Sequence, residues 1–180
     1  MIKEMIVHGE SKPNQMQRIG MYFSRRMDMS SFGRESFPSD GREVPYKLAR
    51  FIDFAKENLF ILSDFLDPDL FAHRAVLTAL GDASMRKVDI RIVVGSDYDR
   101  ASTDIIDGSL GGVLINVLKD GPVEYPFITG DGKYIWIVSP EANYILCKMD
   151  RRFTRQMEAK FRQIYNLTQP LLLEPTKVSV

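Results

Sequence analysis

Two apolar, β-branched runs that each follow a segment of helical periodicity constrain the fold more than any other feature of the sequence. Apolar residues recur at helical spacing over residues 45–57 and again over residues 69–85. Runs of strand length follow each of them, at 59–66 and 88–94. Helices and strands that alternate over short connections are typical of parallel strands joined by crossover helices. We therefore predict an α/β domain with a mixed sheet, largely parallel in its centre, and helices on both faces.

The C-terminal half predicts two more helices and three more strands. Residues 109–119 have helical spacing, and residues 151–165 place their apolar side chains on one stripe after Asp150, the predicted N-cap. Runs of strand length lie at 123–129, 134–139 and 144–149. The first two of these runs are joined by Gly130-Asp131-Gly132-Lys133, a sequence typical of a hairpin turn.

These elements set the expected domain boundaries. The predicted α/β domain covers residues 45–170, between an N-terminal arm of residues 1–44 and a C-terminal tail of residues 171–180. Residues 30–44 (SSFGRESFPSDGREV) are rich in Ser, Gly, Pro and charge without periodicity, which predicts an exposed loop or flexible ribbon.

The charge distribution bears on the class of partner. The 24 basic and 24 acidic residues of the 180-residue chain give a formal net charge of zero, so the chain is not the strongly basic molecule that holds nucleic acid by overall charge. Residues 1–50 carry +3, residues 51–150 carry −7 and residues 151–180 carry +4. The charge distribution is therefore compatible with a local basic face formed by the two ends of the chain.

The number of cysteines and the lengths of the apolar runs indicate the cellular compartment of the protein. Cys147 is the only cysteine, so it cannot form an intramolecular disulfide, and we expect a reducing cytoplasm. The N-terminal residues lack the apolar region of a secretion signal, and no apolar run reaches the roughly 18 residues of a membrane span. We expect a soluble, cytoplasmic protein without a membrane partner or a cofactor.

The order and wording of these elements resemble one half of the phospholipase D-like superfamily. The resemblance covers about Tyr46 to Tyr165. It includes a helix that ends in Ala55-Lys56, the apolar strand after it, and the strand Val88-Asp89-Ile90-Arg91-Ile92-Val93-Val94-Gly95. It implies the fold of such a half-domain. Since members with a single motif pair two halves around a shared cleft, it also implies a homodimer.

The catalytic motif of that superfamily, His-x-Lys-x4-Asp followed by Gly-Lys, is degenerate here. When Asp131-Gly132-Lys133 is aligned with the Asp-Gly-Lys of the motif, Glu124 takes the place of the nucleophilic histidine and Pro126 that of the lysine. The family's Gly-Ser-x-x-Asn segment falls on residues 138–142, where Ser139 matches and the asparagine does not, although Asn143 lies one residue further.

Loss of these two residues removes the chemistry that the resemblance implies. A phosphohistidine mechanism requires a histidine to attack phosphorus and a lysine to neutralise the phosphoryl oxygens, and neither glutamate nor proline supplies these functions. His8 and His73 are the only histidines, and neither is followed by lysine at the motif spacing. We therefore interpret the chain as a catalytically inactive relative that acts by binding nucleic acid or a protein partner.

A cluster of acidic residues supports an alternative, enzymatic interpretation. Asp64, Asp67 and Asp69 follow one predicted strand, and Asp97 and Asp99 follow the next. Carboxyl ends of parallel strands converge at one edge of a sheet, where ligands bind. Carboxylates there suit Mg²⁺. The alternative is a metal-dependent phosphodiesterase or nuclease that uses Asp64, Asp67 and Asp97, whereas the same residues also suit helix caps and turns.

The last predicted helix supplies the candidate nucleic-acid contacts. Arginine is well suited to bidentate phosphate contact. The candidates are Arg25, Arg26, Arg151, Arg152, Arg155, Lys160 and Arg162. A solvated helix face accounts for the same charges. A further alternative is a structural or regulatory subunit of a larger complex, which interacts through Ser30 to Val44.

Overall fold

The computed structural model describes residues 35–38, 41–96, 98, 103, 106, 113–119, 121–123, 125–139 and 144–171, and for residues 35–38, 139 and 144 it describes the backbone alone. The strands are β1 (Glu35–Pro38), β2 (Asn58–Ser63), β3 (Asp89–Val94), β4 (Leu114–Leu118), β5 (Phe127–Gly130), β6 (Tyr134–Ser139), β7 (Tyr144–Met149) and β8 (Thr168–Pro170). The helices are α2 (Val44–Phe54), α3 (Pro68–Phe71), α4 (Arg74–Met85) and α6 (Arg151–Tyr165).

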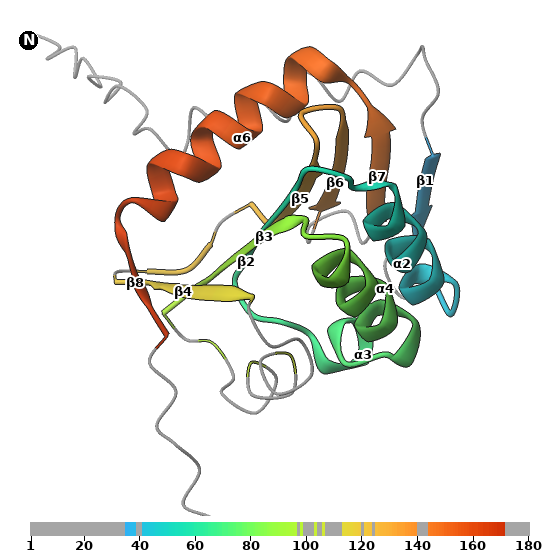
Figure 1. Cartoon of the computed structure of the whole chain (residues 1–180), viewed down its shortest axis with the longest axis horizontal. Helices are drawn as coiled ribbons and strands as arrows, with labels where there is room; N and C mark the ends of the chain where they lie inside the picture. Colours follow the sequence, from blue (N-terminus) through green and yellow to red (C-terminus); the bar gives the residue numbers. More distant parts are fainter. Residues whose placement is uncertain are drawn as a thin grey trace, which may run out of the picture. The chain divides into compact units, whose positions relative to one another are not determined.

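The described strands form one mixed sheet in the order β1-β7-β6-β5-β2-β3-β4-β8 (Figure 1). Strands β2, β3 and β4 pair in parallel. All other neighbours pair antiparallel. The prediction of a mixed α/β sheet with a largely parallel centre is confirmed.

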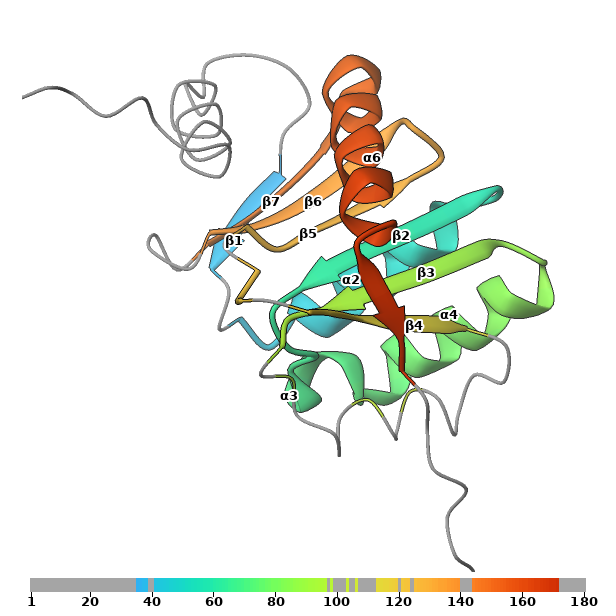
Figure 2. The ribbon, with the colours of Figure 1, turned by 90° about the vertical axis from the view of Figure 1, so that its left-hand side faces the viewer.

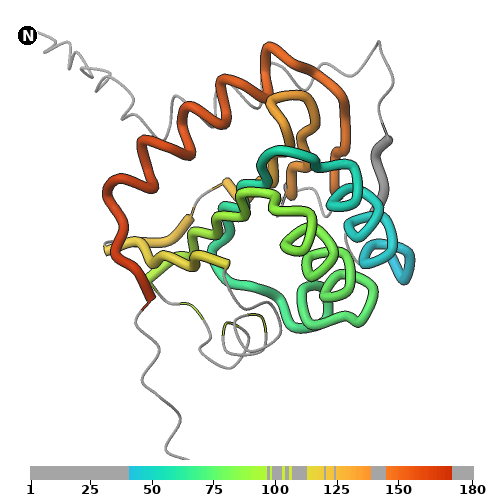
Figure 3. The backbone as a smooth tube through the Cα atoms, viewed as in Figure 1, coloured from blue at the N-terminus to red at the C-terminus, as the bar shows by residue number. Residues whose placement is uncertain are grey.

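The parallel centre follows from the apolar character of β2 and β3. Leu59 to Leu62 are all buried, which is typical of a strand covered on both faces. After β2 the chain passes through α3 and α4 and returns to β3 beside β2 (Figure 3). The two strands are paired from Asn58 with Asp89 to Ser63 with Val94.

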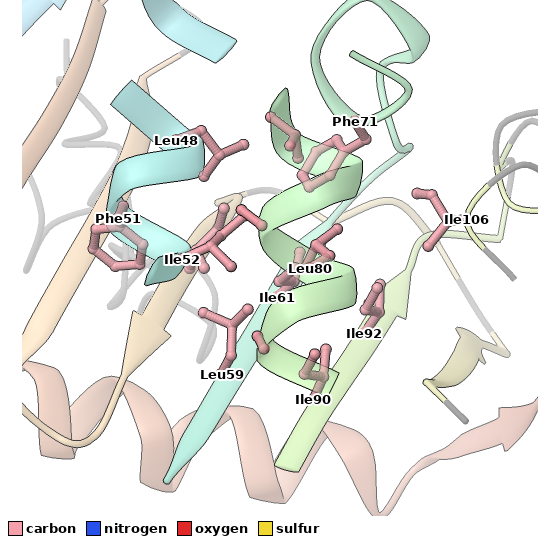
Figure 4. Packing of buried hydrophobic residues seen from close by; sticks show 14 of the residues in the cluster. Leu48, Phe51, Ile52, Leu59, Ile61, Phe71, Leu80, Ile90, Ile92 and Ile106 are labelled. Atoms are coloured by element: carbon pink, nitrogen blue, oxygen red, sulfur yellow. The ribbon is translucent and has the colours of Figure 1, made fainter. Parts of the chain in front are cut away.

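One face of the sheet is covered by α2 and α4, which pack against each other. Their apolar side chains meet the odd-numbered residues of β2 and the even-numbered residues of β3 (Figure 4). The residues in contact include Leu48, Phe51, Ile52, Leu59, Ile61, Leu80, Ile90 and Ile92. Burial of this many apolar side chains supplies the main driving force for folding of the domain.

The other face is covered by α6, which lies across β2, β5 and β6 (Figure 2). Phe161 is fully buried and stacks on Phe60 of β2, with ring centroids 4.8 Å apart and planes 3° from parallel. Phe153 and Met157 are buried on the same stripe of the helix. The predicted helix over 151–165 and its Asp150 cap are confirmed, because the Asp150 carboxylate accepts the backbone N–H of Phe153 at 2.9 Å.

The direction of the strands defines two edges of the sheet. We call the edge where β2, β3 and β4 end the carboxyl edge, and the opposite edge the amino edge. Strand β5 runs from the carboxyl edge, where Phe127 pairs with Leu62, to the amino edge, where Gly130 pairs with Leu59. The hairpin between β5 and β6 therefore lies at the amino edge.

The predicted helix over 109–119 is wrong. Residues 114–118 form β4, the third parallel strand, paired with β3 from Arg91 with Leu114 to Val94 with Val117. A short apolar run such as LINVL fits both periodicities, and the position beside the open side of β3 decides for a strand. The remainder of that segment includes residues outside the described part of the chain.

Two further expectations are corrected in the first half of the chain. The single helix expected over 69–85 is two helices, α3 and α4, because His73 interrupts the first and caps the second: its Nδ1 accepts the N–H of Ala75 at 3.2 Å. Within the expected loop of residues 30–44, residues 35–38 form β1, which pairs with β7.

Among the described helices, none combines the length and the apolar character that crossing a bilayer requires.

Candidate functional site

Asp131 is the only residue that this chain shares with His-x-Lys-x4-Asp, and it lies in the hairpin between β5 and β6. Its φ of 54° and that of Gly132, 60°, place both central residues of the turn in the left-handed region. Positive φ at both central residues is typical of a type I′ turn, for which Asp-Gly is a favoured sequence, and this turn lies within the three-residue loop 131–133. The turn places the carboxylate of Asp131 at the amino edge of the sheet.

The carboxylate of Asp131 binds the turn between α2 and β2. It accepts the backbone N–H groups of Lys56 at 3.1 and 3.0 Å, Glu57 at 2.8 Å and Asn58 at 3.1 Å. In return, the N–H of Asp131 is within 3.2 Å of both the side-chain and the backbone oxygen of Asn58. Lys56 and Glu57 lie between α2 and β2, and Asn58 begins β2, so the carboxylate of Asp131 joins the hairpin to the start of β2.

A second carboxylate is buried at the same hairpin. The N–H of Gly132 donates to Oε1 of Glu158 on α6 at 2.6 Å, and Glu158 is 8% exposed. Burial raises the pKa of Glu158, opposed by the Gly132 hydrogen bond and by the charges of Arg162 and Arg155. A side chain at position 132 would come within 3.3 Å of Arg155, so glycine also allows α6 to approach the turn.

Pro126, which aligns with the lysine of the motif, lies at the opposite edge of the sheet. Pro126 immediately precedes β5 at the carboxyl edge and lines a cavity there, whereas Glu124 lies outside the described residues. Five residues of extended chain, roughly 17 Å, separate Pro126 from Asp131. The two described positions of the motif therefore lie at opposite edges of the sheet.

The loops at the carboxyl edge are held by Asp64. Its Oδ1 accepts the N–H of Val123 at 3.0 Å, and its backbone oxygen accepts the N–H of Gly95 at 2.9 Å. A Cβ at position 95 would come within 2.1 Å of the same Oδ1, so a side chain there would displace the carboxylate. Asp64 thus joins the ends of β2 and β3 to the segment before β5.

The cavity at this edge has a volume of about 370 Å³ and lies between the sheet and α3. Its lining is mostly apolar and includes Pro126, Ile128, Trp136 and Val138. Asp64, Asp67 and Ser63 are the polar residues among the described lining. Where the superfamily motif would place a cation, this chain has the hydrocarbon ring of Pro126.

Two of the three residues of the metal-dependent phosphodiesterase alternative lie at this cavity. Asp64 and Asp67 both line it, but each carboxylate already accepts a backbone N–H: Asp64 that of Val123, and Asp67 that of Asp69 at 3.0 Å, as the cap of α3. Asp97 and Asp99 lie outside the described residues. Within the described part of the chain, no three His, Cys, Asp or Glu side chains are arranged to hold a metal ion.

The arginines of α6 are brought together on the outer side of the helix. Arg151, Arg152, Arg155 and Arg162 are exposed, and Lys160 is half-buried. At a rise of 1.5 Å per residue, the row from Arg151 to Arg162 is roughly 16 Å long. We call these four arginines the α6 arginine row. Arg25 and Arg26, the other predicted contacts, lie outside the described residues, as does His8.

One basic residue that the sequence analysis did not select lies close to the end of this row. The guanidinium of Arg91 on β3 is 5.2 Å from the ring centroid of Tyr165 and 6.0 Å from that of Phe60, and Arg162 is 5.0 Å from the Phe60 centroid. Asp89 holds Arg91 in an ion pair at 2.9 Å and raises its pKa. The signal available in the sequence was a charged residue inside the apolar run DIRIVV.

The remaining predicted residues have structural roles or are described only in part. His73, the only histidine among the described residues, caps α4 on the face opposite α6 and packs edge-on against Tyr46. Ser139 ends β6 at the carboxyl edge, where its backbone pairs with Tyr144. Neither residue is placed beside Asp131.

The sheet order, the helical layer on each face and the hairpin position define a phospholipase D-like fold, as the sequence resemblance predicted. Comparison with solved structures identifies similar chains. Nuc from Salmonella typhimurium, a phospholipase D family member, superposes with a TM-score of 0.62 at 17% identity over 78% of this chain and 99% of that chain. NucT from Helicobacter pylori gives 0.57 at 16% identity over 78% of this chain and 100% of that chain.

A third similar structure is described as a DNA-binding protein. TrmBL2, an archaeal chromatin protein whose structure shows a novel mode of DNA binding, gives a TM-score of 0.57 at 11% identity over 87% of this chain and 61% of that chain. At these identities the likeness concerns the fold. No protein-family model and no curated protein sequence matches the chain.

The structural role of Asp131 leads to a stability prediction. Asp131→Ala removes the acceptor for three backbone donors and should lower the free energy of unfolding by about 2–4 kcal/mol. Asp131→Asn keeps one acceptor oxygen and tolerates the left-handed backbone, so its loss should be smaller. Urea unfolding measures both. Asp53→Ala, an exposed carboxylate on α2, is the control and should change stability by less than about 0.5 kcal/mol. Equal effects of all three variants would contradict the role.

The raised pKa of Glu158 leads to a pH prediction. Above the ordinary pKa of glutamate, about 4.3, the folded state holds the Glu158 proton more tightly than the unfolded state, so this group lowers the stability as pH rises. Glu158→Gln removes the ionisation and keeps an oxygen for Gly132. The stability of Glu158→Gln relative to the unmodified protein should therefore increase between pH 4 and 7, as measured by urea unfolding. A difference that is constant or decreases with pH would contradict the buried, ionisable role.

Proposed function

We propose that the chain is a catalytically inactive phospholipase D-like domain that binds the phosphate backbone of double-stranded nucleic acid through the α6 arginine row. The observation that carries the proposal is the separation of charge on α6. Four arginines are exposed, whereas the single carboxylate within the helix, Glu158, is buried and bonded to Gly132. The four exposed arginines outnumber this one buried carboxylate, which interacts with Arg155 and Arg162, so the outer surface of the helix carries a net positive charge.

The shape of the α6 arginine row favours a duplex over a single strand. Single-strand binding depends on exposed aromatic rings on which bases stack. The exposed residues of α6 are arginine, glutamine and alanine, and its aromatic residues are buried or half-buried. A straight row of roughly 16 Å spans about five base-pair rises of 3.4 Å, which suits contacts to phosphates and not to bases. Binding should therefore be independent of sequence.

The fold comparison supports this proposal, since TrmBL2, with a similar fold, is described as binding DNA. Arg91 extends the positive surface at one end of the row, because Arg91 and Arg162 both lie within 6.0 Å of the Phe60 ring centroid. The proposal includes a homodimer, in which two rows would double the number of phosphate contacts. Sedimentation velocity measures that state directly.

Catalytic inactivity is proposed from the chemistry at the motif positions. Pro126 has no ionisable group and lines an apolar cavity, and Asp131 is used at the opposite edge. His73 is bonded through Nδ1 to its own helix, on the α2 and α4 face. None of these residues supplies a nucleophile and a cation at one place, as phosphoryl transfer requires.

The binding proposal is tested by fluorescence anisotropy with a labelled duplex of about 20 base pairs between about 50 and 200 mM salt. Arg152→Ala with Arg155→Ala should weaken binding at least about tenfold. It should also reduce the slope of log affinity against log salt by about 1.8, since each lost phosphate contact removes about 0.9. Arg50→Ala with Arg74→Ala removes the same charge from the α2 and α4 face and is the matched control. Equal losses in the two double variants would contradict a role for α6.

The inactivity proposal has its own assay. Bis(p-nitrophenyl) phosphate and a labelled duplex should both stay intact when incubated with the protein, with Mg²⁺ or with EDTA. Turnover that requires Mg²⁺ and disappears in Asp64→Asn with Asp67→Asn would instead establish the metal-dependent alternative. Turnover that persists in EDTA would show that another residue acts as the nucleophile.

A further inference from the structure

The cavity at the carboxyl edge has the size and position of a small-molecule site. Its volume of about 370 Å³ falls within the range of roughly 300–1,000 Å³ that is typical of ligand pockets. It lies where β2 ends and the chain turns into α3, at the edge where α/β sheets commonly bind ligands. This position is independent of the α6 arginine row, which lies on the other face of the sheet.

The described lining selects for an apolar body. Strands β2, β5, β6 and β7 contribute Ile61, Ile128, Trp136, Val138 and Ile145, and α3 contributes Phe71. Phe65 lines the cavity as well and is 52% exposed. An exposed aromatic ring beside an apolar cavity gains buried area only when the cavity is occupied.

The polar residues of the described lining select against negative charge. Asp64 and Asp67 both line the cavity, and the described lining contains no lysine, arginine or histidine. The Ser63 hydroxyl already donates to the backbone oxygen of Phe65 at 2.7 Å, so it is not positioned to neutralise an anion. Two carboxylates that no cation of the described lining balances repel a phosphate, sulfonate or carboxylate group of a ligand.

We propose that this cavity binds a small apolar molecule that carries no negative charge. The cavity therefore differs from a phosphodiester-binding site in two ways. Pro126 stands where the motif has a lysine, and the carboxylates of Asp64 and Asp67 disfavour anionic ligands. The single tryptophan of the chain, Trp136, lines the cavity and is only 1% exposed, so its fluorescence reports on the occupant directly.

The test uses a matched pair of dyes and the full-length protein. N-phenyl-1-naphthylamine is neutral, and 1-anilinonaphthalene-8-sulfonate has the same ring skeleton with an added sulfonate. The neutral dye should quench Trp136 emission by energy transfer, gain fluorescence and bind at least about tenfold more tightly than the sulfonate, a difference of about 1.4 kcal/mol. Equal affinity of the two dyes, or no binding of the neutral dye, overturns the proposal.

Three variants test whether the dye binds in this cavity. Val138→Phe fills the space and should abolish binding of the neutral dye, whereas Met85→Phe adds the same ring at a residue that is 76% exposed on α4 and should leave binding unchanged. Asp67→Asn keeps a good helix cap and removes one negative charge, so it should narrow the preference for the neutral dye. Unchanged dye affinity in Val138→Phe with a native unfolding transition overturns the assignment.

A second copy of the chain is the competing occupant of this edge. Sedimentation velocity with and without the neutral dye separates the two cases. Binding that leaves the oligomeric state unchanged supports a ligand in the cavity. Binding that occurs only when a dimer dissociates on dilution would show that the apolar surface is covered by a second copy, and would overturn the proposal. The Asp67→Asn comparison stays informative even where Val138→Phe fails to fold.

Discussion

The hydrogen bonds between the Asp131 carboxylate and the turn at residues 56–58 fix the relation between the two halves of the sheet. Strands β2 to β4 are parallel and β5 to β7 are antiparallel, and the halves meet only where β2 pairs with β5. Asp131 lies at the end of β5, and its three backbone donors lead directly into β2. Because a shift by one residue would turn the side chains of a strand to the opposite face, a carboxylate that accepts these N–H groups also secures the register. The buried Glu158 extends this constraint to α6 through Gly132, so one hairpin positions both layers.

This arrangement places the contacts of Asp131 that support the fold and the motif position of Pro126 at different edges of the sheet. Asp131, which stabilises the hairpin, and Pro126 lie at opposite ends of the four-residue strand β5. The Asp131 carboxylate is bonded to the backbone of residues 56–58 at the amino edge. Pro126 contributes an apolar side chain to the cavity at the carboxyl edge, together with Ile128 and Val138. Because its hydrogen bonds account for the presence of Asp131, this residue by itself is no evidence of activity.

Elements with a strong periodic signal were predictable from the sequence, and contacts between distant residues were not. The strands at 134–139 and 144–149 and the helix at 151–165 agree with the structure at both ends. Residues 114–118 were assigned to a helix because a five-residue apolar run has no decisive period, and only pairing with β3 makes it a strand. The sequence indicates the turn and the motif match at Asp131 but not its bonds to residues 56–58, since these partners lie 73–75 residues away. Asp67 was correctly interpreted as a possible cap, because that interaction is local.

The chain has a formal net charge of zero, but two of its surfaces differ in the charge of the ligand that they favour. The exposed arginines of α6 lie on one face of the sheet, and the carboxylates of Asp64 and Asp67 line a cavity that opens between the other face and α3. Under the proposed function, a nucleic acid is attracted to the first surface and repelled from the second. Because the two surfaces share no residue, a neutral ligand in the cavity and a duplex on α6 do not compete for the same groups. Any coupling between them has to pass through β2, whose Phe60 contacts Phe161 and Arg162 on one face while Ile61 lines the cavity on the other.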